Sequence, residues 1–98
     1  MLIDKGVAVG EVVTIKLTSG EEIIGKLEDE SADCHIKMSK PMVVAMGQQG
    51  PGLMPYLFTV NPDKTVKISR SVLVIMEATD KSFADAYIQN TTGIKLAL

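Results

Sequence analysis

The sequence of 98 residues contains no tryptophan, one cysteine, one histidine and one arginine, and only 4% of its residues are aromatic. Cys34 has no partner for an internal disulfide, which is typical of proteins in a reducing compartment. A single histidine leaves no pair for nucleophilic catalysis, and the acidic residues at 28–30 and 33 match no known spacing of metal ligands. We therefore predict that the chain is not an enzyme and has no catalytic residues, metal or cofactor.

Long apolar segments are also absent. No stretch approaches the roughly 20 apolar residues that cross a bilayer, and residues 1–11 lack the apolar core of a secretory signal. These absences predict a cytoplasmic protein without a membrane partner. The net charge of −2 excludes broad electrostatic capture of nucleic acid. Any site for a polyanion must therefore be local.

The segment 13–30, VTIKLTSGEEIIGKLEDE, alternates apolar and polar residues on both sides of Thr-Ser-Gly, as two strands of a hairpin do. A three-residue loop with Gly20 in the left-handed conformation sets Val13 opposite Gly25 and Ile15 opposite Ile23. Gly25 then lies on the inner face between apolar neighbours. A missing side chain at that position lets a strand bend tightly over a small core. The hairpin therefore predicts a strongly curved sheet, and most simply a small barrel.

The rest of the chain predicts further strands and one helix, all in a single domain that spans residues 1–98. In residues 33–38 the alternation places Cys34, Ile36 and Met38 inward, and Pro41 then breaks or kinks the strand. Further strand patterns lie at 42–46, 53–60, 65–69 and 71–77. Residues 80–91 have helical spacing with Asp80 as N-cap. We expect a mostly β barrel over about residues 8–78, followed by a short C-terminal helix.

Five successive residues of the last strand are apolar, so both of its faces require burial. A barrel of this size covers only one face. Either a second copy of the chain or the C-terminal helix could cover the other, and we favour a second copy because a ten-residue helix is too short. The predicted interface between copies comprises Val72, Leu73, Val74, Ile75 and Met76.

Two segments, VTIKLTSGEEIIGKLEDESADCHIKM (13–38) and KISRSVLVIM (67–76), resemble the first and second motifs of the Sm-like (LSm) superfamily. The chain is also similar to small Sm-like proteins of marine bacteriophages. The resemblance implies a small, strongly bent, five-stranded antiparallel Sm-like (SH3-like) barrel and a homo-oligomeric ring of five to seven subunits. It further implies single-stranded RNA near the ring pore, in the host-cell cytoplasm if the gene is a phage gene.

The resemblance places His35 where the family has a base-contacting asparagine. Candidate RNA-binding residues are therefore His35, Lys37, Ser69, Arg70 and Ser71, through stacking, local charge and hydroxyl contacts. Each also has an ordinary alternative: a surface residue, a turn residue, or, for Arg70, a salt bridge. Tyr56 and Phe58 are either stacking platforms or core residues. The alternative function is a protein-interaction or structural ring scaffold without nucleic-acid binding.

Overall fold

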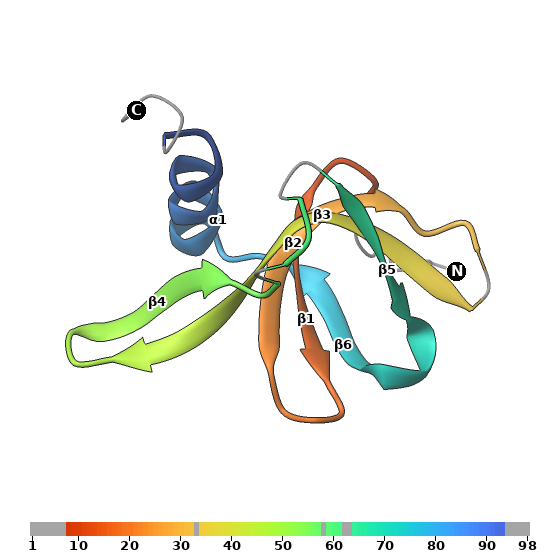
Figure 1. Cartoon of the computed structure of the whole chain (residues 1–98), viewed down its shortest axis with the longest axis horizontal. Coiled ribbons are helices and arrows are strands. Elements are labelled where there is room, and N and C mark those ends of the chain that lie inside the picture. The colour runs from red at the N-terminus through yellow and green to blue at the C-terminus, as the bar shows by residue number, and fades with distance from the viewer. Residues whose placement is uncertain (1–7, 33, 58, 62–63, 94–98) are drawn as a thin grey trace.

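The computed structural model describes residues 8–32, 34–57, 59–61 and 64–93. Figure 1 shows a strongly bent antiparallel sheet with one helix at the C-terminal end. The strands are β1 (Val12–Leu17), β2 (Glu22–Asp29), β3 (His35–Gly47), β4 (Gly50–Pro55), β5 (Thr65–Ser69) and β6 (Leu73–Ala78). A 3₁₀ turn η1 (Arg70–Val72) joins the last two strands, and helix α1 (Lys81–Ile88) continues into a π-helical turn η2 (Gln89–Gly93). Asp80 caps α1 as predicted, because its side chain accepts the amide hydrogen of Ser82.

The strand order is β4-β3-β2-β1-β6, and β5 also pairs with β3. In the residues that the structure describes, the sheet has six strands where five were predicted, and these strands do not close into a barrel. β4 overlaps the strand predicted over residues 53–60 but begins three residues earlier, and it forms a hairpin with the part of β3 that follows Pro41. β5 pairs with residues 35–39 of β3, and β4 pairs with residues 42–47. β4 and β5 therefore follow one another along the same edge of β3.

The hairpin of β1 and β2 has the register that the sequence predicts. Val13 lies opposite Gly25 and Ile15 opposite Ile23, and Gly20 has a φ of +103° in the loop. Gly25 is needed because a Cβ atom there would overlap the Cγ and Sδ atoms of Met38. Met38 is fully buried, so the close approach of β2 and β3 depends on a residue without a side chain.

Two apolar clusters lie on opposite faces of the sheet. The first fills the concave side of the bend and comprises Val13, Ile15, Leu17, Ile23, Leu27, Ile36 and Met38. The second comprises Ile24, Met42 and Tyr87, with Phe83 of α1 packed against it. Helix α1 therefore covers β2 and the bend of β3, and Figure 1 shows it on the side of the molecule away from β6.

β3 passes through Pro41 by means of a bulge. Three steps along β3, from Ser39 to Met42, face only two steps along β2. Lys40, inside this bulge, has a φ of +50°, which side chains other than glycine rarely adopt. The carbonyl groups of Ser39 and Lys40 both accept from the hydroxyl group of Tyr87, at 3.0 Å each. The helix thus stabilises the bulge that bends the longest strand.

Within the described ranges, no helix is long and apolar enough to cross a membrane.

Candidate nucleic-acid interface

β3 and β5 form a short ladder whose outer face is polar. His35 lies opposite Ser69, Lys37 opposite Lys67 and Ser39 opposite Thr65. Since side chains two residues apart on a strand share a face, these six side chains form one surface, here called the β3–β5 face. The intervening residues Ile36, Met38, Val66 and Ile68 point to the other side, where Ile36 and Met38 are fully buried.

The β3–β5 face brings three of the predicted residues, His35, Lys37 and Ser69, beside a lysine that the sequence interpretation missed. Lys67 is exposed and directly faces Lys37. Like charges in this arrangement repel each other and destabilise a sheet. The signal was present in the alternation of residues 65–69, but only the pairing of β5 with β3 places the two ammonium groups together.

Arg70 holds the loop between β2 and β3. Its Nε group donates to the carbonyl of Ala32 at 3.0 Å, and its terminal guanidinium nitrogen donates to the carbonyl of Glu30 at 2.6 Å. Its main-chain N–H donates to the carbonyl of Cys34. The arginine therefore binds main-chain carbonyl groups where a salt bridge was the alternative prediction, and it fixes the loop that precedes His35.

Ser69 and Ser71 shape the turn that carries Arg70. The hydroxyl of Ser69 accepts the amide hydrogen of Ser71 and lies 2.8 Å from its hydroxyl oxygen, which caps η1. Both residues are exposed, so their hydroxyl oxygens can still accept or donate a further hydrogen bond.

Cys34 is exposed, and its predicted inward position was wrong. The alternation fails there because the strand begins only at His35, so Cys34 still belongs to the loop. Its Sγ atom lies 3.6 Å from Nδ1 of His35, and either group can donate the hydrogen. The contact orients the imidazole of the half-buried His35 at the end of the β3–β5 face.

The acidic loop before β3 is organised by its own hydrogen bonds. The Asp29 carboxylate accepts from both the amide and the hydroxyl of Ser31. These bonds hold the pKa of Asp29 below its usual value, and the positive charge of Lys37 acts in the same direction. In the part of the chain that the structure describes, no three His, Cys, Asp or Glu side chains form a group that could hold a metal ion.

Four of the five predicted interface residues belong to β6, which lies at one edge of the sheet. Among the described strands β6 pairs with β1 alone, and two of its side chains are largely exposed, Val74 by 59% and Ile75 by 51%. Leu73 and Met76 instead pack against the first apolar cluster, and Val72 belongs to η1. Because α1 packs elsewhere, it does not cover Val74 and Ile75.

Of the two aromatic candidates, Tyr56 and Phe58, the structure describes only the first. Tyr56 packs against the first apolar cluster, in agreement with the core alternative, whereas Phe58 lies outside the described residues.

Comparison with known proteins adds no assignment: no protein-family model matches the chain, and no curated protein matches it either.

Proposed function

We propose that the protein binds single-stranded RNA on the β3–β5 face. The observation that carries the proposal is the pairing of Lys37 with Lys67, next to the pairing of His35 with Ser69. Two facing ammonium groups destabilise the isolated sheet, but they suit a ligand with closely spaced phosphates. An imidazole at the end of the same ladder can stack on a base.

We also propose that β1, β2, β3, β5 and β6 correspond to the five strands of an Sm-like barrel, with β4 as an insertion. β5 and β6 are the first and last members of this set across the sheet, and each pairs with one other strand of the described sheet. The β6 edge of one copy would pair with the β5 edge of the next and cover Val74 and Ile75. Such head-to-tail pairing closes into a ring of five to seven subunits when the angle between copies is suitable.

Fluorescence anisotropy with short labelled U-rich and A-rich RNA tests the binding proposal. We expect binding at low salt that weakens as salt is added, since phosphate contacts release counterions. Replacing Lys37 and Lys67 together by alanine should lower the slope of log affinity against log salt by about 1.4, at about 0.7 per contact with a single strand. Lys16→Ala removes an exposed lysine from β1 and is the control. No binding at low salt would refute the proposal.

A protein-binding scaffold is the second candidate, and the arm formed by β3 and β4 favours it. Residues 41–61 include no charged side chain. Figure 1 shows this hairpin extending away from the rest of the sheet, and Met46 on it is 77% exposed. Depletion of charge with exposed methionine is typical of the centre of a protein interface. Pull-down from a nuclease-treated lysate, with a variant in which Met46 is replaced by lysine, tests this candidate.

A further inference from the structure

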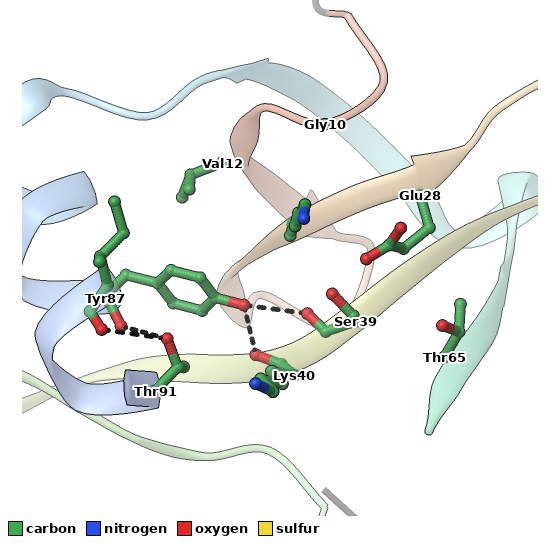
Figure 2. Close-up of a pocket in the computed structure, with 10 residues that line it drawn as sticks. Gly10, Val12, Glu28, Ser39, Lys40, Thr65, Tyr87 and Thr91 are labelled. Carbon is green, nitrogen blue, oxygen red and sulfur yellow. Dashed lines mark hydrogen bonds between the residues drawn. The ribbon is translucent and has the colours of Figure 1, made fainter. Parts of the chain in front are cut away.

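A pocket of about 540 Å³ lies between α1, the bulge of β3 and the neighbouring strands (Figure 2). Its size falls within the range of pockets that hold small ligands. It is separate from the loop around Arg70, although Ser39 and Thr65 of the β3–β5 face form part of its wall. Three unusual local features meet there: the bulge, the positive φ of Lys40, and the π-helical turn after α1. Bulges, strained backbone and π-helical turns are all enriched at functional sites.

The charges in the pocket wall are mixed. Two lysines, Lys26 of β2 and Lys40 in the bulge, provide ammonium groups, and Glu28 provides a carboxylate. Lys26 and Glu28 both belong to β2 and both line the pocket. Burial is the main cause of the raised pKa of the Tyr87 hydroxyl, and the negative charge of Glu28 acts in the same direction. Glu28 would repel a ligand with only negative charges, and the two lysines would repel a ligand with only positive charges.

One side of the pocket is apolar. Val12, Ile88 and the ring of Tyr87 line the side next to α1. Figure 2 shows the Tyr87 ring extending from the helix toward Ser39 and Lys40, with its hydroxyl already bonded to their carbonyl groups. That hydroxyl is therefore part of the wall. The charged groups that can meet a ligand are two ammonium groups and one carboxylate, beside an apolar surface and the hydroxyl groups of Ser39 and Thr65.

We propose that this pocket binds a small zwitterion with an apolar group, of the class of the apolar α-amino acids. Lys26 and Lys40 bind the ligand carboxylate, Glu28 binds the ligand ammonium group, and the apolar side chain lies against Val12 and Ile88. Each of the three ligand groups then has a partner of complementary chemistry, which a simple anion does not achieve. The site does not depend on RNA binding or on ring formation.

Nuclear magnetic resonance titration of the full chain with L-leucine tests the site. We expect shifts in the amide signals of Lys26, Lys40 and Tyr87 that saturate. Three analogues each remove one ligand group: leucinamide lacks the carboxylate, N-acetyl-leucine lacks the ammonium group, and glycine lacks the apolar side chain. Each should bind about tenfold more weakly or worse, since a charge-assisted pair or a buried branched side chain contributes at least that factor.

Matched variants identify the protein groups. Lys40→Gly removes one ammonium group and also relieves the positive φ, so loss of binding cannot be attributed to backbone strain. Glu28→Gln should weaken L-leucine binding but leave N-acetyl-leucine unchanged, because only the first ligand has an ammonium group. Lys16→Ala and Lys67→Ala should bind L-leucine as the unmodified chain does, and Lys67→Ala separates this site from the RNA face.

Three results would overturn the inference. One is the absence of any change in the amide signals of Lys26, Lys40 and Tyr87 when L-leucine is added to tens of millimolar. The second is unchanged binding by leucinamide or by Lys40→Gly. The third is tighter binding of adenosine 5′-monophosphate than of leucine, which would assign the pocket to phosphorylated ligands.

Discussion

Lys37 and Lys67 lie directly opposite each other across β3 and β5, so two like charges face one another on the β3–β5 face. At its other edge β3 pairs with β2, where Asp29 lies opposite Lys37. The carboxylate of Asp29 offsets part of the charge of Lys37. Lys67 belongs to β5, which among the described strands pairs with β3 alone. The repulsion therefore falls mainly on the β3–β5 ladder.

Lys67→Glu should stabilise the chain and weaken RNA binding. A salt bridge to Lys37 replaces the repulsion, and the free energy of unfolding should rise by roughly 0.5 kcal/mol. The same change removes one phosphate contact and adds a repulsive charge, so RNA affinity should fall at least tenfold. Urea unfolding and fluorescence anisotropy measure the two effects.

Lys16→Glu is the matched control, because Lys16 is exposed on β1 and paired with Glu22. Lys16→Glu should destabilise the fold slightly and leave the RNA affinity within about twofold of that of the unmodified chain. Equal RNA affinity of Lys67→Glu and the unmodified chain would contradict the proposed face.

Gly25→Ala should destabilise the fold by roughly 1–3 kcal/mol, the usual cost of overpacking. The added methyl group overlaps Met38, which is fully buried and cannot move away without disturbing the first apolar cluster. Gly52→Ala, in β4, is the control, because a Cβ atom there has open space around it. Thermal or urea unfolding of both variants checks the prediction, and equal stabilities would show that the bend of β2 does not need glycine.

Alkaline pH should weaken the fold through Tyr87. Burial raises the pKa of Tyr87 from 10.0 to about 12. Since the folded chain favours the neutral phenol, its contribution is fully present below pH 10 and is lost as the pH rises through about 12. The loss should be roughly 2–3 kcal/mol, at about 1.4 kcal/mol for each pH unit of difference. Urea unfolding at pH 9 and at pH 11.5 measures it.

Tyr87→Phe is the control for this pH effect. At neutral pH it should cost about 1 kcal/mol, because the carbonyl groups of Ser39 and Lys40 lose their donor. Between pH 10 and 12 its stability should decline less than that of the unmodified chain. An equal decline would assign the alkaline transition to other groups.

Local features of this fold could be predicted from the sequence, whereas the pairing of distant segments could not. The hairpin register, the need for glycine at position 25 and the cap at Asp80 follow from residues close in sequence. The continuation of β3 through Pro41 depends on a bulge that Tyr87 stabilises from 46 positions further along the chain. No local pattern encodes that contact.

The candidate site, too, could be predicted from the sequence only in its local features. Alternation placed His35 and Lys37 on one outward face, but the facing Lys67 became visible only when β5 was paired with β3. Cys34 was misplaced because alternation does not indicate where a strand begins. The pocket beside α1 joins residues from Gly10 to Thr91, and no motif links them.

Val74→Glu should prevent assembly without unfolding the single chain. Val74 is exposed on the free β6 edge, so a carboxylate there is hydrated in the monomer and buried in the proposed contact. Val9→Glu replaces an equally exposed valine outside the strands and should leave assembly intact. Sedimentation velocity compares the two variants, and assembly of Val74→Glu like that of Val9→Glu would argue against the β6 edge.

The most direct test of the proposed assembly is the mass of the unmodified 10.5 kDa chain by light scattering at high micromolar concentration. We expect a particle of five to seven chains. A mass equal to one chain would contradict this expectation and would remove the ring from the proposed function.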